Sequence, residues 1–209
     1  MAIETPLQSR NGQKPTSRTI EIKPLEVTRF AMTLQGTTPL ICDAFSEERR
    51  RRLESTQTGV ARDKLSARRP DQEFEDALYR LPDGRYGFPK LGVRKAIAVA
   101  ATRMSDTKGT EMLAAFMIDT PDEYLALDAA EPEMRRDHVT RMGRANLAYR
   151  AQFYPWSLSV PVKLHEPIVT LNEFIDIVSK AGIGVGIGNW RPEKKGDFGT
   201  FEVVEVVGR

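Results

Sequence analysis

The chain has 209 residues, of which 40% are apolar and 29% charged. This balance predicts a soluble globular protein built as one domain, and it excludes a fully disordered chain. Lys and Arg number 31 against 29 Asp and Glu, which leaves a net charge of only +2. Bulk charge alone therefore does not indicate nucleic acid.

The sequence also argues against several other classes of protein. No stretch approaches the roughly 18 apolar residues of a membrane-spanning helix, and residues 1–20 lack the apolar core of a signal peptide. Cys42 is the single cysteine, which excludes an internal disulfide and a cysteine zinc site, and two histidines argue against a histidine-rich metal site. We therefore expect a cytoplasmic protein without a metal, a cofactor or a membrane partner.

The first part of the chain is an arm followed by a strand. Residues 1–24 carry three prolines among polar side chains, which predicts a flexible N-terminal arm that becomes ordered against a partner or remains a disordered tail. Residues 25–209 are expected to form a single domain. Alternating apolar and polar residues predict its first strand over residues 27–34, and an extended stretch follows over residues 39–43.

Two basic insertions interrupt the regular elements, at residues 44–72 and 128–150. The first holds four consecutive arginines and is expected to be partly helical near residues 46–54. The other expected elements, in chain order, are a hairpin over 77–88, a helix from Pro89 to the region of Gly109, a strand over 158–164, a helix over 171–182 that opens with the capping box Thr170–Glu173, a glycine-rich loop over 182–199 and a last strand over 200–207. This order predicts an α+β, ferredoxin-like domain with inserted loops.

The glycine-rich loop is the strongest functional signal. Six glycines within residues 182–199 allow a backbone to approach a ligand closely and to turn its N–H groups toward an anion. Arg191, Lys194 and Lys195 add positive charge, and Trp190 offers a face for stacking. The loop follows a helix and precedes a strand, so it is neither a dinucleotide-binding fingerprint nor a Walker loop. A tight structural turn is the alternative interpretation.

The helix after Pro89 and the two insertions add basic side chains. Lys90 and Arg94 share one helix face and Lys95 flanks it; a solvated charged face is the plain alternative. The insertions and the stretch around residues 135–150 concentrate positive charge, which is typical of a phosphate-binding face. The candidate side chains in these segments are Arg49, Arg50, Arg51, Arg52, Arg141, Arg144 and Arg150.

Catalytic signals are weak. His138 lies among arginines and is a candidate general base for RNA cleavage, although a contact to phosphate or plain exposure explains it as well. Asp43 follows the first strand and precedes an insertion. No other pair or triad of residues has a spacing that points to catalysis.

Three segments together resemble the RAMP superfamily, in particular the backbone subunits of CRISPR effector complexes, and also uncharacterised bacteriophage proteins with the same closing pattern. They are residues 38–43 with their terminal aspartate, residues 83–96, which lead into the basic helix, and the glycine-rich end of the chain from residue 182 to residue 201. The resemblance implies a modified ferredoxin-like (RRM-like) domain that polymerises along single-stranded guide RNA. It also implies a bacterial cell, or one infected by a phage, as the place of action.

Carried over to this chain, the resemblance implies contacts to the nucleic-acid backbone from Lys90, Arg94 and Lys95. It implies that Gly184, Gly186, Gly188 and Arg191 form the strand-binding loop. One of the insertions would act as a thumb between nucleotides, with Arg141 and Arg144 as contacts. Some backbone subunits cleave RNA with an aspartate in the loop after the first strand, but the residues around Asp43 do not match that loop.

We therefore expect a protein that coats single-stranded RNA, or single-stranded DNA, as a helical homo-oligomer without catalysing a reaction. Two alternatives remain open. One is a ribonuclease of the RAMP type that uses Asp43 or His138, and the other is a phage structural or assembly subunit whose basic patches contact protein.

Overall fold

The computed structural model describes residues 25–45, 47–58, 68–141 and 143–208. The arm predicted for residues 1–24, and residues 59–67 of the first insertion, lie outside this part of the chain. The elements, in chain order, are β1 (Thr28–Gly36), β2 (Leu40–Cys42), α1 (Glu47–Gln57), α2 (Pro70–Glu75), β3 (Gly87–Pro89), α3 (Lys90–Met104), α4 (Gly109–Ala115), β4 (Phe116–Ile118), β5 (Tyr124–Ala129), β6 (Glu133–Arg141), β7 (Arg144–Phe153), β8 (Trp156–Leu164), α5 (Leu171–Gly184), the 3-10 helix η1 (Pro192–Lys194) and β9 (Phe201–Gly208). The expected α+β class is confirmed.

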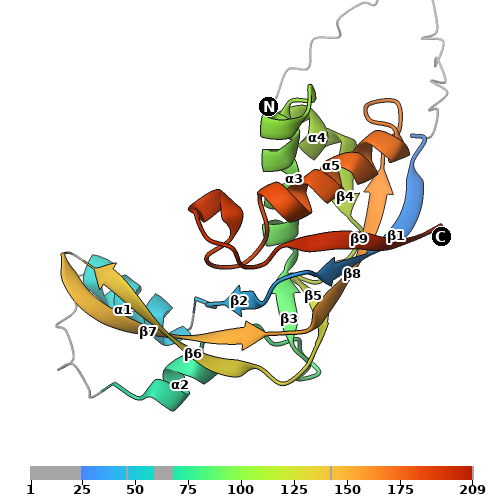
Figure 1. Ribbon diagram of the computed structural model, residues 1–209. Helices are drawn as coiled ribbons and strands as arrows, with labels where there is room; N and C mark the ends of the chain where they lie inside the picture. The colour runs from blue at the N-terminus through green and yellow to red at the C-terminus, as the bar shows by residue number, and fades with distance from the viewer. Residues whose placement is uncertain (1–24, 46, 59–67, 142, 209) are drawn as a thin grey trace, which may run out of the picture.

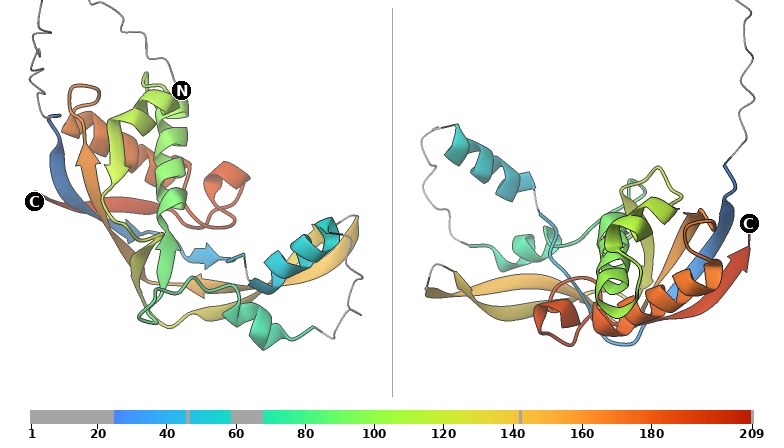
Figure 2. Two further views of the ribbon diagram at one scale, coloured as in Figure 1. Left: turned by 180° about the vertical axis from the view of Figure 1, so that it is seen from behind. Right: turned by 90° about the horizontal axis from the view of Figure 1, so that it is seen from above.

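The larger sheet has the strand order β3-β5-β8-β1-β9. β4 also pairs with β8, at residues 162–164, whereas β5 pairs with residues 156–158 of that strand. Every pairing in it is antiparallel. Helices α3 and α5 pack against each other and cover one face of this sheet (Figures 1 and 2). Phe30, Met32 and Leu34 alternate along β1 into the core beneath them, as the period of a half-buried strand requires.

In the middle of β1 and β8, the opposite face of the large sheet carries small and polar side chains. Because neighbouring residues of a strand point to opposite faces, β1 presents Ala31 and Thr33 there, and β8 presents Ser157 and Ser159. None of the four is buried. This part of the sheet has no aromatic ring, so it offers no platform for stacking bases.

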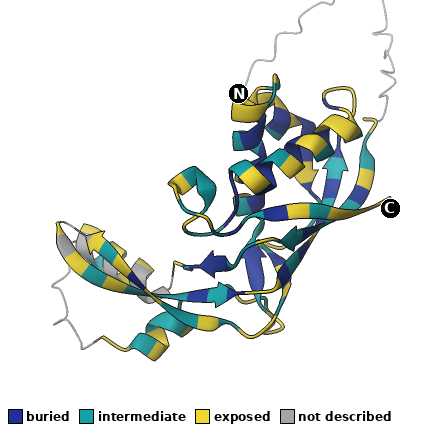
Figure 3. Ribbon diagram, in the orientation of Figure 1, coloured by how far each residue is buried: buried dark blue, intermediate teal, exposed yellow. Residues whose placement is uncertain are grey.

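A second sheet, of order β2-β7-β6, extends away from the helical layer (Figure 1). Strands β6 and β7 form a hairpin that pairs Glu133 with Gln152 at its base and Arg141 with Arg144 at its tip. The second basic insertion is therefore largely this hairpin. Burial falls from its base to its tip (Figure 3), because the base packs on the core and the tip does not.

The side chain of Arg68 joins the two basic insertions. Arg68 donates hydrogen bonds to Asn146 Oδ1 at 2.7 Å and to the Leu147 carbonyl at 2.8 Å, both on β7. Its guanidinium also lies 5.3 Å from the centre of the Tyr149 ring and forms an ion pair with Glu73. Helix α2 packs on the same strand. Arg68 thus fixes the end of the first insertion on the hairpin of the second.

Some predicted elements differ from the observed ones. The hairpin expected over residues 77–88 is short: Arg80 and Tyr86 form an isolated bridge, and Gly87 N donates to the Tyr79 carbonyl at 2.8 Å. Its second arm continues as β3, which pairs with β5. The helix after Pro89 ends at Met104 rather than near Gly109, where α4 begins. None of the described helices is long and apolar enough to cross a membrane.

Candidate nucleic-acid interface

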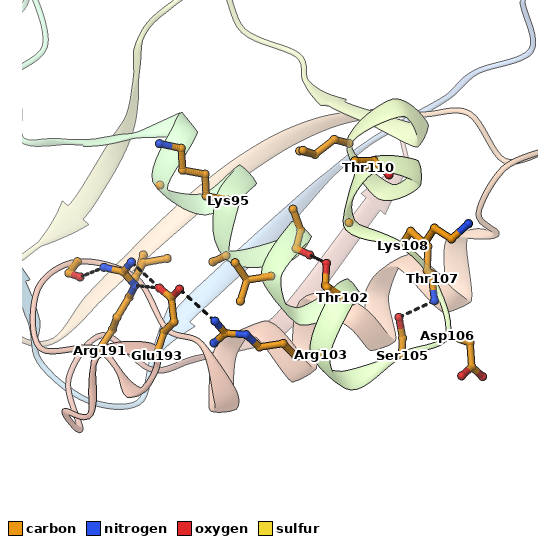
Figure 4. Close-up of a pocket in the computed structure, with 18 residues that line it drawn as sticks. Lys95, Thr102, Arg103, Ser105, Asp106, Thr107, Lys108, Thr110, Arg191 and Glu193 are labelled. Carbon is orange, nitrogen blue, oxygen red and sulfur yellow. Dashed lines mark hydrogen bonds and ion pairs between the residues drawn. The ribbon is translucent and has the colours of Figure 1, made fainter.

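A groove of about 790 Å³ lies between α3, the turn into α4 and the glycine-rich loop (Figure 4). It brings together three residues that sequence reasoning singled out, Lys95 from α3 and Gly188 and Arg191 from the loop. Ala96, Val99, Thr102, Arg103, Lys108, Leu113, Ile187 and Glu193 are among its other lining residues. The groove therefore has apolar walls and a mainly basic rim.

The sequence of α3 places Lys95 and Arg103 on the groove side. Val93, Ile97 and Ala100 are buried against the sheet and α5, so the helix is anchored by the opposite stripe. Lys95 and Arg103 are eight positions apart and lie on one face of the helix. The turn that follows is held tightly, because a Cβ on Gly109 would collide with Thr102 Oγ1 and with the Ala98 carbonyl.

The glycine-rich loop forms the opposite wall and is held by backbone hydrogen bonds, both within itself and to the segment around β2. Ile187 N donates to the Gly199 carbonyl at 2.9 Å, Asn189 N to the Ile41 carbonyl at 2.9 Å, and Gly199 N to the Pro39 carbonyl at 2.8 Å. These N–H groups are thus used inside the protein. The tight structural turn that the sequence left open explains them, and an anion cradle made of the loop's backbone stays a prediction.

Close approach and backbone conformation both require glycine at Gly188. Its φ is +77°, and a Cβ there would lie 2.6 Å from the Ile41 carbonyl oxygen. Trp190 and Lys195 adopt left-handed conformations nearby, with φ of +55° and +64°, which side chains other than glycine adopt at a cost. The loop therefore has a shape that the end of β2 helps to enforce.

Glu193 organises the cations of the groove (Figure 4). Its carboxylate accepts from Arg191 Nε at 2.9 Å and lies 3.8 Å from the Arg103 guanidinium. Burial opposes ionisation of Glu193, but the hydrogen bonds and charge of Arg191, with Lys194 and Arg103, outweigh it and hold the pKa of Glu193 below its ordinary value. Arg191 also donates to the Gly188 carbonyl at 2.9 Å, which fixes its guanidinium over the loop.

Lys95 is the most available cation at this site. It is exposed, and none of the carboxylates in the described part of the chain lies within 4.0 Å of its ammonium. Lys108, at the other end of the groove, lies 3.5 Å from Glu111. Together with Arg103 and Arg191, these lysines give the groove four cations against the carboxylates of Asp106 and Glu193.

The two other predicted cations of α3 hold the fold together. Lys90 donates to the Thr120 carbonyl at 2.8 Å, and Arg94 donates to the Leu113 carbonyl at 2.8 Å. The Arg94 guanidinium also lies 5.8 Å from the centre of the Phe116 ring. Neither residue lines the groove, and both are engaged in structural contacts. Their binding of phosphate stays a prediction.

A second constellation joins the hairpin, the end of β2 and the glycine-rich loop. Arg150 donates to Asp43 Oδ2 at 3.2 Å and to Asp137 Oδ2 at 3.0 Å. Asp137 is 7% exposed and also accepts from Arg135 at 2.5 Å and from Trp190 Nε1 at 3.2 Å. Burial opposes the ionisation of Asp137, but the hydrogen bonds from Arg135 and Arg150 outweigh it, so its pKa lies below the ordinary value.

This cluster gives three predicted site residues a structural role. The charge of Arg150 is paired with two carboxylates, and Asp43 supplies one of them. Trp190 is 40% exposed, but its indole N–H is engaged and its ring lies 6.0 Å from the Arg150 guanidinium. A stacking role for the open part of that ring stays a prediction.

The two catalytic candidates are not brought together. Asp43 reaches the hairpin face that carries Arg150 and Asp137. His138 follows Asp137 along β6, so its side chain points to the opposite face, where it is exposed. Among the described residues there is also no group of three or more His, Cys, Asp or Glu side chains that could hold a metal ion.

None of the remaining predicted residues is part of the described groove lining. Arg50 and Arg51 are exposed on α1, whereas the side chains of Arg49 and Arg52 on that helix, and of Arg141 and Arg144 at the hairpin tip, lie outside the described part of the structure. Gly184 and Gly186 belong to the loop but not to the groove lining, and neither do Lys194 and Lys195.

Sequence reasoning missed Arg103 and Lys108 at the groove and Arg135 in the cluster. The spacing of Arg103 from Lys95 is a signal that could have found it, because residues eight apart share a helix face. A scan of the chain against protein-family models finds no match, and a search of curated proteins finds none either. Any assignment of function therefore depends on the geometry of the groove.

Proposed function

We propose that this protein binds single-stranded nucleic acid, RNA or DNA, and coats it as a helical homo-oligomer. The observation that carries the proposal is the convergence of Lys95, Arg103, Lys108 and Arg191 on one groove with apolar walls. Cations that neutralise phosphates supply most of the affinity for a nucleic-acid backbone. Apolar walls suit the faces of bases and sugars that a single strand exposes.

The strand order supports the part of the proposal that concerns the fold, a ferredoxin-like domain. If β4 and β5 are taken together as one strand position, the order of strands in the sheet is β9-β1-β8-β4/β5. In the sequence, α3 lies between β1 and β4/β5, and α5 lies between β8 and β9. A βαββαβ unit of the ferredoxin type has this order of strands. The protruding β6–β7 hairpin would then be the thumb that the RAMP resemblance implies.

Within the groove, the rim and the walls have different tasks. A phosphate would lie against Lys95, whose ammonium has no carboxylate neighbour among the described residues. Arg191, held by Glu193 and by the Gly188 carbonyl, would contact a second phosphate. Val99 and Leu113 would pack on sugar or base between them. One such site is weak, and repetition along a strand supplies the avidity.

The first test is the ratio of absorbance at 260 and 280 nm in the purified protein, followed by size exclusion after treatment with RNase or DNase. A high ratio and a large species that collapses under one nuclease support the proposal and identify the nucleic acid. A protein-like ratio in the eluted protein peak, even after incubation with single-stranded oligonucleotides at low salt, would contradict it. Assembly without nucleic acid would then favour a structural subunit.

The second test assigns binding to the groove. We expect Lys95→Gln and Arg191→Gln to weaken binding of a labelled 30-nucleotide strand and to reduce the slope of log affinity against log salt by about one phosphate contact each. Arg85→Gln is the matched control, because Arg85 is an exposed arginine in the turn before β3 and lies outside the groove. Equal losses in all three variants would mean that binding is not localised there.

A further inference from the structure

We propose that the outer edge of β9 binds residues 18–23 from the N-terminal arm of a second copy of this chain, as an added strand. The proposal rests on the proposed function for the existence of an oligomer and names the contact that joins neighbouring copies. It concerns a protein surface rather than the groove, so the two can fail separately.

β9 is the last strand of the large sheet. In the part of the chain that the structure describes, it pairs with β1 and with no other strand. An edge strand presents a row of unpaired N–H and C=O groups that can pair with another chain. At eight residues, β9 is long enough to accept one.

The side chains of β9 suit a protein partner better than water. Val204, Val206 and Val207 are 54%, 40% and 50% exposed. Protein edges are commonly protected against pairing by proline or by charged side chains, above all lysine. Residues 201–208 contain no proline and no lysine, and their charged residues are both acidic. The strand carries two exposed glutamates, Glu202 and Glu205, and no basic residue within the same range.

Residues 18–23 of the arm have the complementary composition. The sequence Thr19-Ile20-Glu21-Ile22-Lys23 alternates β-branched apolar and polar residues, the pattern of a half-buried strand. The arm as a whole, residues 1–24, has four Lys and Arg against two Glu. Its net charge is therefore opposite to that of β9, and its two isoleucines could cover the exposed valines.

A second copy fits the edge better than the chain's own arm does. Phe30 of β1 pairs with Gly208 of β9, so β1 begins near the end of β9, on the inner side of that strand. To pair with the outer edge, residues 18–23 of the same chain would have to pass around β9 through residues 24–27. β9 would then lie between two strands that follow each other in the sequence. Consecutive strands are neighbours in about two-thirds of cases, so this arrangement is the less common one. The arm of a neighbour can approach the edge directly and run antiparallel.

Cysteine cross-linking in the full chain, without nucleic acid, tests the contact. Cys42 is buried, so it does not compete with engineered thiols. One preparation carries Ile22→Cys and a differently tagged one carries Val204→Cys or Val206→Cys; the two are mixed and oxidised. The control partner is Leu147→Cys, an apolar residue of similar exposure on β7. We expect about tenfold more cross-linking to β9 than to this control, because strand pairing holds the thiols within disulfide reach.

The outcomes separate the possible occupants of the edge. A cross-link between differently tagged chains supports the proposal. A cross-link that forms only when both cysteines are in one chain, and that leaves the protein monomeric, overturns it in favour of the chain's own arm. Cross-linking to β9 no better than to Leu147→Cys overturns it as well.

A groove variant separates this proposal from the proposed function. Lys95→Gln added to both preparations should leave the cross-link unchanged while nucleic-acid binding falls. If the cross-link is lost with Lys95→Gln, the contact depends on the groove and the proposal is overturned. If the cross-link is absent but nucleic acid binds, the edge contact fails and the proposed function stands.

Discussion

The indole N–H of Trp190 donates a hydrogen bond to Asp137 at 3.2 Å, and the accepting oxygen is the same one that Arg150 contacts at 3.0 Å. Trp190 belongs to the glycine-rich loop, which forms one wall of the groove, and Asp137 belongs to the protruding hairpin. Asp137 therefore connects the glycine-rich loop to the protruding hairpin, the two regions that the proposed function assigns to nucleic acid.

Asp137→Asn should destabilise the fold. The substitution removes the carboxylate that pairs with Arg135 and leaves Arg150 with Asp43 alone, and breaking a buried ion pair in this way is strongly destabilising. We expect a loss of about 2–4 kcal/mol in the free energy of unfolding, measured by urea denaturation. Asp128→Asn, an exposed aspartate on β5, should cost less than about 0.5 kcal/mol. Similar losses in both variants would mean that the cluster does not stabilise the fold.

The same carboxylate predicts a dependence of stability on pH. The pKa of Asp137 is lower in the folded protein than its ordinary value, so the folded state binds this proton less readily than the unfolded state does. The stabilisation is complete above the ordinary pKa of about 3.9 and is lost as the pH falls through the folded value. The wild-type protein should lose stability in acid below about pH 4, and Asp137→Asn should lose less over that range. If the free energy of unfolding, measured with urea, falls equally in acid for the wild type and for Asp137→Asn, Asp137 is not the group responsible.

Several elements could be predicted from local sequence because their signals are local. The capping box of Thr170 and Glu173 begins α5, as observed, and Phe174 and Val178 lie on its buried face. The alternation along β1 predicts its inward residues. Both signals depend on residues a few positions apart, which secondary structure brings together without help from the rest of the chain.

The functional regions were harder to predict because they depend on distant residues. Asp43 and Arg150 are 107 positions apart, and nothing near either residue shows that they pair. The glycines of the loop are compatible both with an anion cradle and with tight internal packing. The carbonyl of Ile41 explains why residue 188 has to be a glycine, and it is placed there by tertiary structure alone.

Gly188→Ala tests whether this packing shapes the groove. Gly188 and Gly84 both have positive φ, of +77° and +89°, but a Cβ has open space at Gly84 and would lie 2.6 Å from the Ile41 carbonyl oxygen at Gly188. Both substitutions therefore carry the conformational cost of about 1–2 kcal/mol, and Gly188→Ala adds a steric one. Thermal unfolding should show a clearly larger loss for Gly188→Ala, together with weaker binding of nucleic acid. Equal losses in the two variants would show that the close approach costs nothing.

Glu193→Gln should strengthen the binding of nucleic acid. The glutamine keeps an oxygen that can accept from Arg191, while the negative charge between Arg191 and Arg103 is removed. Because the pKa of Glu193 lies below its ordinary value, the wild-type carboxylate is ionised at neutral pH, and the substitution changes the charge of the groove by a full unit. A unit charge close to a phosphate near the protein surface is worth on the order of 1 kcal/mol, so we expect affinity for a labelled single strand to rise about threefold to tenfold at low salt. Glu75→Gln is the matched control, since it also removes a carboxylate from an arginine, Arg80, at 2.9 Å, but on α2 and outside the groove. A gain of the same size in both variants would point to a general effect of net charge, and no gain at Glu193 would mean that phosphate does not enter this groove.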